Sequence, residues 1–144
     1  MKPKALAVKA ALGTALAAMT LLAPPADAAT VKTTTSACTA GTFKGNVSLK
    51  YETTGGHHKP VSATMAGGPY IGDSTKLTLR IFFIEDGVTT TAYSRTWTWL
   101  GTPPPKVTQP IPDSVTTPDS AKSYVSAAFT GGGEALCTAK AEIK

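Results

Sequence analysis

The clearest pattern from residue 29 onward is an alternation of apolar and polar side chains. This is the period of a β-strand that buries one of its two faces. Between residues 46 and 53, for example, Val47, Leu49 and Tyr51 alternate with polar residues. No segment after residue 28 sustains the apolar period of a helix, and β-branched threonine, which favours strands, is frequent. The pattern therefore predicts an all-β fold.

Runs of this kind, bounded by glycine, proline and aspartate, predict seven strands. They are expected at residues 29–39, 46–53, 61–66, 76–85, 88–100, 123–130 and 134–143. About seven short strands with such spacing are typical of an immunoglobulin-like antiparallel β-sandwich. We therefore expect residues 29–144 to form a single domain with this architecture.

The longest expected hairpin turns around Asp86 and Gly87, and the length of its loop decides which side chains face the core. With a two-residue loop, Trp97 and Trp99 lie on the face opposite to the apolar side chains of the first strand. A three-residue loop, which adds Glu85, shifts the pairing by one residue and brings both tryptophans onto the apolar face. We prefer the longer loop, because only it gives one continuous core face and its left-handed third position suits glycine.

The same reasoning applied to the last hairpin predicts a loop of three glycines at residues 131–133. Phe129 then faces Ala135, and Ala127 faces Cys137. This register turns the cysteine toward the core of the domain.

Residues 101–120 form an unusual segment that contains six prolines. Proline lacks the N–H donor of a β-ladder, so no central strand is expected there. We interpret the segment as an extended crossover between two sheets. Its length leaves a functional loop as the alternative.

The pattern of residues 1–28 predicts a Sec-type signal peptide. A lysine-rich start precedes an apolar run at residues 10–23, and small residues at Ala26 and Ala28 form a cleavage site. The apolar run is shorter than a membrane-spanning helix, and its lysine- and alanine-rich character is typical of bacterial exported proteins. We therefore expect a secreted, extracellular protein that begins at Ala29 and has no membrane anchor.

The chain has two cysteines, Cys38 and Cys137. In an exported protein these are expected to form a disulfide bond, with two free thiols as the alternative. Such a bond would connect the first expected strand with the last.

The net charge does not indicate a particular class of partner. The leader accounts for three lysines and one aspartate of the 14 basic and nine acidic residues, so the remainder carries a net charge of about +3. Its basic residues are scattered singly, whereas nucleic-acid binding requires a clustered basic face. We therefore do not expect nucleic acid as a partner.

His57 and His58 are the only histidines, and Glu52 precedes them. One histidine could act as a general base with Glu52 as its partner. We prefer a solvated turn, because no nucleophile motif such as G-x-S-x-G accompanies the pair. A metal site would need further ligands. We therefore expect no catalytic residue, no metal and no cofactor.

Four aromatic residues are the candidate ligand-binding residues: Tyr70, Tyr93, Trp97 and Trp99. The last three are spaced as on one strand, where they could form a flat platform for sugars. The register argument favours a core position for them instead. Tyr70 lies in a Gly-Pro-Tyr-Ile loop and is expected to be exposed.

These observations favour a secreted, non-catalytic binding or interaction domain with an extracellular protein or glycan as its unknown partner. We expect this domain to be a monomer. One alternative is a small secreted hydrolase or nuclease that uses His57 and His58. A second alternative is a structural cell-surface protein.

Overall fold

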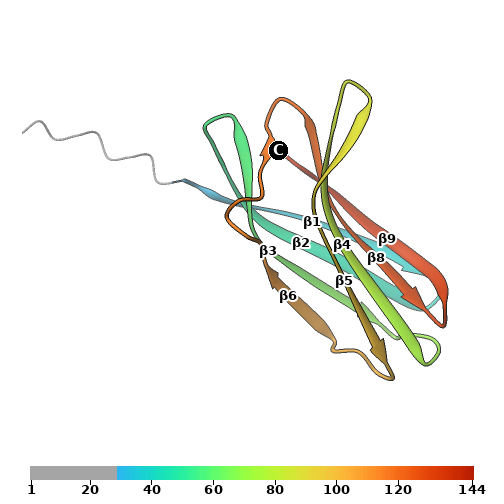
Figure 1. Cartoon of the computed structure of the whole chain (residues 1–144). Helices are drawn as coiled ribbons and strands as arrows, with labels where there is room; N and C mark the ends of the chain where they lie inside the picture. The colour runs from blue at the N-terminus through green and yellow to red at the C-terminus, as the bar shows by residue number, and fades with distance from the viewer. Residues whose placement is uncertain (1–28) are drawn as a thin grey trace, which may run out of the picture.

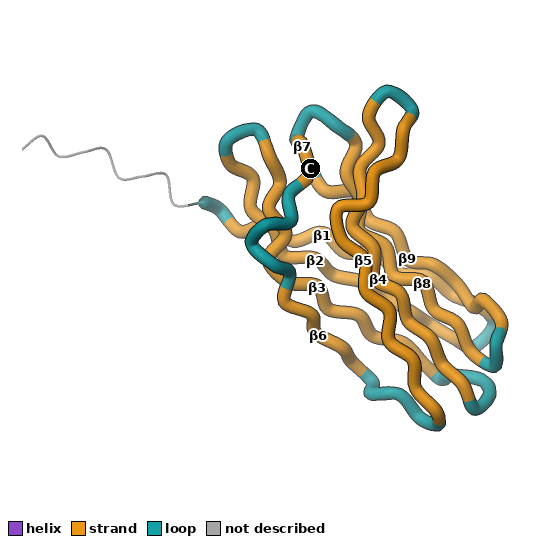
Figure 2. Tube along the Cα trace, viewed as in Figure 1, coloured by secondary structure: helices purple, strands orange, loops and turns teal. Residues whose placement is uncertain are grey.

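The computed structural model describes residues 29–144, which form two antiparallel sheets packed against each other (Figure 1). The first sheet contains, in spatial order, β1 (Val31–Ala40), β2 (Phe43–Thr54), β3 (His57–Gly68) and β6 (Lys106–Pro110), and β7 (Thr117–Pro118) also pairs with β3. The second sheet contains, in spatial order, β5 (Val88–Leu100), β4 (Ser74–Glu85), β8 (Lys122–Gly131) and β9 (Glu134–Ile143). The loops lie at the two ends of the sandwich (Figure 2).

The predicted antiparallel β-sandwich is confirmed. The strand order does not confirm the immunoglobulin-like expectation, because the consecutive strands β1, β2 and β3 are neighbours in one sheet. In the immunoglobulin order the second strand pairs with the fifth. The expected signal peptide, residues 1–28, lies outside the described residues. Residues 29–144 contain no helix that is long and apolar enough to cross a membrane.

The two strands that the sequence did not predict, β6 and β7, both come from the proline-rich segment. β6 pairs only with β3 and forms an edge of the first sheet. An edge is the position in a sheet where proline is tolerated, since one side of the strand needs no donor. Between β6 and β7, the buried side chains of Ile111 and Val115 join the core.

Two-residue loops close the β2–β3, β4–β5 and β8–β9 hairpins: Gly55 with Gly56, Asp86 with Gly87, and Gly132 with Gly133. All six residues have positive φ, as a type I′ turn requires, and this turn matches the twist of the strands. The three-residue loops expected in the last two hairpins are therefore wrong. Asp86 adopts a φ of 50°, which aspartate tolerates better than most residues. The loop therefore needs only Asp86 and Gly87, and Glu85 pairs with Val88 in the ladder.

Each of these hairpins then carries one extra, unpaired residue in its second strand: Val61, Ala92 and Leu136. Such a β-bulge reverses the alternation of side chains beyond it. In β5 it places Trp97 opposite Leu77, so both tryptophans lie on the face that the sequence predicted. The bulge, and not a longer loop, produces this register.

In the last hairpin, the two-residue loop and the bulge at Leu136 give pairs that differ from those predicted. Phe129 lies opposite Cys137, and Ala127 lies opposite Ala139. The cysteine still faces inward, because the bulge restores the side that a three-residue loop would have given.

The core lies between the sheets and includes the expected Val47, Leu49 and Tyr51. Phe129 is 1% exposed, and its ring lies 5.3 Å from that of Phe43. A Cβ atom on Gly45 would lie 2.5 Å from the ring of Phe129, so only glycine fits at this position. The smallest residue thus makes room for one of the largest side chains of the core.

Trp97 and Trp99 pack against this core but are only half-buried. Full burial, which the sequence reasoning expected, is not reached because β5 is an edge strand. Its inner side chains have a neighbouring strand on one side only.

Candidate functional site

A cavity of about 440 Å³ opens at one end of the sandwich. It lies between the loop that joins β3 to β4 and the segment that follows β5. Four glycines and three prolines form most of its wall, together with Thr102, Tyr70 and Asp73. The wall is therefore largely backbone and apolar ring surface, with one carboxylate.

Hydrogen bonds and close packing hold the walls of this cavity in place. The Gly101 N–H donates to the Asp73 carbonyl at 2.9 Å and so joins the two walls. The Gly132 N–H donates to the Ser74 carbonyl at 2.8 Å. A Cβ on Gly72 would lie 2.6 Å from the Cα of Gly132, so the loop packs tightly on the β8–β9 turn. The cavity is thus preformed.

Tyr70 is the one predicted ligand-binding residue that lines the cavity. Its ring lies 5.1 Å from that of Phe43, so it is half-buried and not exposed as the sequence suggested. Burial raises the pKa of Tyr70 above its ordinary value. Its position follows from the packing of the loop against the core.

The other three candidates, Tyr93, Trp97 and Trp99, form a row on the inner face of β5. Arg95 belongs to the same row, with its Cζ atom 5.1 Å from the centre of the Trp97 ring. Its Nη1 also donates to the Gln109 side chain of β6 at 2.5 Å. These residues line the side of the sandwich where β5 and β6 are the edges, and not the cavity.

An aromatic pair on the outer face of the second sheet is not among the residues predicted from the sequence. Phe82 and Tyr124 are opposite each other in the β4–β8 ladder, with ring centres 5.4 Å apart. Arg80 lies 4.8 Å from the Phe82 ring, and Lys140 lies 4.2 Å from the Tyr124 ring. The sequence could have placed this pair on the outer face. Phe82 and Tyr124 have even numbers, whereas the core residues of β4 and β8 have odd numbers, and alternate side chains of a strand point to opposite faces.

His58 is buried at 4% exposure and stands edge-on to Tyr51, with ring centres 5.8 Å apart. Its Nδ1 atom shares a hydrogen bond with the Thr53 hydroxyl at 2.8 Å. The expected solvated turn is therefore wrong for His58, although His57 is exposed. The two-residue loop lets β3 begin at His57, and successive side chains of a strand point to opposite faces. The two imidazoles therefore do not converge.

Glu52, the proposed partner of this pair, lies opposite Lys59 in the β2–β3 ladder. Within residues 29–144, no hydrogen bond joins Glu52 to either histidine. The same part of the chain contains no group of three or more histidine, cysteine or acidic side chains that could hold a metal ion.

Burial lowers the pKa of His58, Asp119 partly opposes this shift, and Lys32 adds to it. Below the ordinary histidine pKa of about 6.5, this side chain is therefore protonated more in the unfolded state than in the folded state. We expect the free energy of unfolding to fall as the pH drops below about 6.5. His58→Gln should flatten this dependence, and His57→Gln should retain it. Urea unfolding across this range measures both slopes, and equal slopes for the wild type and His58→Gln would contradict the assignment.

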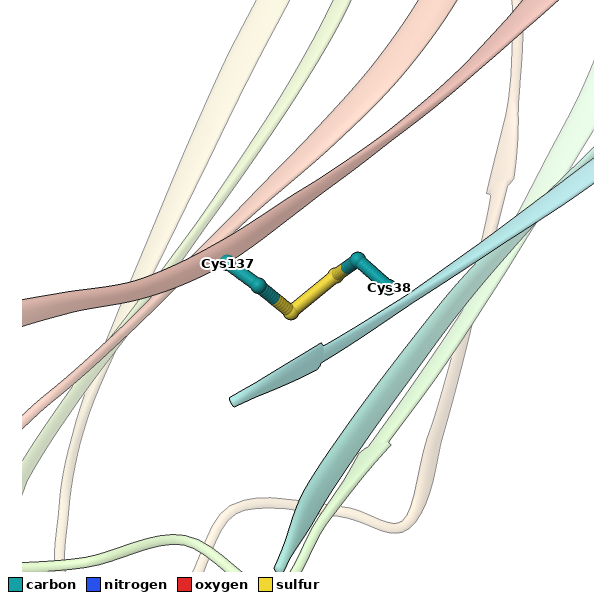
Figure 3. Close-up of a disulfide and its surroundings, with 2 residues drawn as sticks. All are labelled: Cys38 and Cys137. Atoms are coloured by element: carbon teal, nitrogen blue, oxygen red, sulfur yellow. A yellow bond between two sulfur atoms is a disulfide. The ribbon is translucent and has the colours of Figure 1, made fainter. Parts of the chain in front are cut away.

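The predicted disulfide bond between Cys38 and Cys137 is confirmed, with Cα atoms 5.9 Å apart (Figure 3). It joins β1 of the first sheet to β9 of the second. Thr34 adds a hydrogen bond to the Glu142 carbonyl between the same two strands. This side of the sandwich is thus closed by covalent and polar contacts.

No family model, curated protein or solved structure shows a significant match to this chain. The candidate site is therefore defined by its own geometry. The aromatic row on β5 and the aromatic pair on the outer face are surfaces of strands, whereas the end cavity is concave. Its wall combines an aromatic ring, a hydroxyl and a carboxylate.

Proposed function

We propose that this protein is a secreted, non-catalytic binding domain that takes a small ligand into the end cavity beside Tyr70. The observation that carries this proposal is the preformed cavity of about 440 Å³. Small-molecule sites in proteins typically have volumes of about 300–1,000 Å³, largely apolar walls and a few polar groups. The hydrogen bond that the Gly101 N–H donates to the Asp73 carbonyl links the two walls of the cavity.

The wall indicates the chemistry of the ligand. Proline rings, glycine backbone and the Tyr70 ring suit a compact apolar or aromatic body. Asp73 is the one charged residue among the lining residues, and its carboxylate would favour a cationic group. We therefore propose a small organic cation, such as an aromatic amine, as the ligand class.

The signal-peptide pattern and the disulfide bond support an extracellular location for this activity. Disulfide bonds persist mainly in oxidising compartments. The lysine- and alanine-rich leader supports a bacterial origin.

The probes for this proposal are 2-phenylethylammonium and its neutral analogue 2-phenylethanol, titrated into the ¹⁵N-labelled protein. Ligands of this size are expected to bind with a Kd on the order of millimolar. The backbone amides of Gly67, Gly68, Gly72 and Gly101 should shift because these glycines line the cavity. Gly55 and Gly87, which belong to the β2–β3 and β4–β5 turns, serve as internal controls.

Two variants test the roles of the side chains. Asp73→Asn should reduce the affinity for the ammonium probe to that for the alcohol and leave the alcohol unaffected. Tyr70→Ala should abolish binding of both probes, whereas Tyr70→Phe, which keeps the ring against Phe43, should retain it. Absence of shifts with both probes, or shifts that do not involve the lining glycines, would contradict the proposed site.

A further inference from the structure

The edge strand β5 differs from the other edge strands of the sandwich. β1 and β9 are held against each other by the disulfide bond, and β6 has only five residues and ends in proline. β5 has 13 residues, contains no proline and carries a single charged side chain, Arg95. It pairs only with β4 in the part of the chain that the structure describes.

An edge strand of this kind presents a row of N–H and C=O groups that can pair with another strand. Proteins usually protect such edges with charges, prolines, bulges or short strands. Here one bulge, at Ala92, interrupts β5, and residues 93–100 beyond it pair regularly with β4. Leu100 lies in this regular segment and is 89% exposed.

We propose that β5 pairs antiparallel with β5 of a second copy of this chain, around a two-fold axis at Thr96. A two-fold axis perpendicular to a sheet requires that residues on the same face lie opposite each other, so the axis must pass through a residue position. An axis at Arg95 would place two like charges opposite each other, which is unfavourable. An axis at Thr96 leaves each Arg95 opposite Trp97 of the second copy.

The remaining pairs within residues 93–99 also match in chemistry. Thr96 lies opposite itself and Ser94 lies opposite Thr98 of the second copy, so hydroxyl groups meet hydroxyl groups on the outer face. Tyr93 lies opposite Trp99 of the second copy on the inner face, where the half-buried rings gain a neighbour. An axis at Trp97 would instead place Ser94 opposite the apolar Leu100.

This dimer would replace the monomer expected from the sequence and is independent of the end cavity. Its interface is one strand wide, so we expect a Kd on the order of micromolar. Sedimentation velocity of the purified protein should show a monomer–dimer equilibrium across this concentration range. Thr96→Lys, which places two like charges at the axis, should shift the equilibrium to monomer. Thr78→Lys, on the neighbouring strand β4, should leave the equilibrium unchanged.

Cysteine crosslinking tests the register. The two native cysteines are bonded to each other, so an introduced cysteine supplies the one free thiol. Facing residues of antiparallel strands have Cα atoms about 4.5–5.5 Å apart, within disulfide range. Under mild oxidation Thr96→Cys should form a covalent dimer. Ser94→Cys and Thr98→Cys should crosslink only when they are mixed.

Thr78→Cys is the matched control, because Thr78 lies opposite Thr96 in the ladder but on an interior strand. Two results would overturn the proposal. One is a wild-type protein that stays monomeric at all concentrations, and the other is Thr96→Cys that crosslinks no faster than Thr78→Cys.

Discussion

Replacing Phe129 by alanine is expected to lower the free energy of unfolding by about 3–5 kcal/mol. The ring is 1% exposed, packs against Phe43 and lies directly beneath Gly45 and Gly67. Large-to-small substitutions in a core cost both the transfer energy of the lost atoms and the energy of the cavity left behind. The two glycines have no side chains that could move into the space, so the cavity should persist.

Phe82→Ala is the matched control for this prediction, because it removes the same atoms from the outer face of the same sheet. Phe82 is 8% exposed and packs against Tyr124, Arg80 and Lys140, which can rearrange toward solvent. Urea unfolding followed by circular dichroism should show a clearly smaller loss for Phe82→Ala. Similar losses for the two variants would mean that Phe129 does not occupy the centre of the core.

The sequence was sufficient to predict seven of the nine strands of residues 29–144 and the buried faces of most of them. Alternation alone identified Val47, Leu49 and Tyr51, because a half-buried strand has a side-chain period of two. It did not predict the pairing of β5. The two-residue loop alone would turn Trp97 away from the core, and the bulge at Ala92 turns it back. Only their combination determines which face Trp97 occupies.

The loop type itself could have been predicted. Asp-Gly is among the strongest signals for a two-residue type I′ turn, because both residues tolerate positive φ. A three-residue loop is the simplest way to place Trp97 and Trp99 on the core face without a bulge. In the structure the Ala92 bulge achieves the same result. A bulge leaves no comparable mark in the sequence.

The alternation of apolar and polar residues also does not show whether a strand lies at the edge or in the interior of its sheet. Trp97 and Trp99 have the spacing of core residues, but β5 is an edge and leaves them half-buried. The cavity combines residues 67–73 with residues 101–105, which only the fold brings together. Tyr70 is the one lining residue that the sequence predicts as a candidate, and it is half-buried and not exposed as predicted.

Replacing both Cys38 and Cys137 by serine is expected to lower the free energy of unfolding by about 2–5 kcal/mol. The bond joins positions 99 residues apart, and closing so long a loop restricts the unfolded chain strongly. The loss should also be visible locally, because β1 pairs only with β2 and has a mostly exposed, threonine-rich sequence. Besides the bond, Thr34 and Lys32 of β1 donate hydrogen bonds to the C-terminal strand region, and Ala40 packs against the core.

Hydrogen exchange of the double variant should therefore be faster in β1 than in the interior strands β4 and β8. Urea unfolding of the wild type in reducing buffer should approach the stability of the variant, and the variant itself should not respond to reductant. This comparison separates loss of the bond from any effect of the serine side chains. A variant within about 0.5 kcal/mol of the oxidised wild type, a difference typical of neutral surface substitutions, would show that the other contacts between β1 and β9 suffice to close this side of the sandwich.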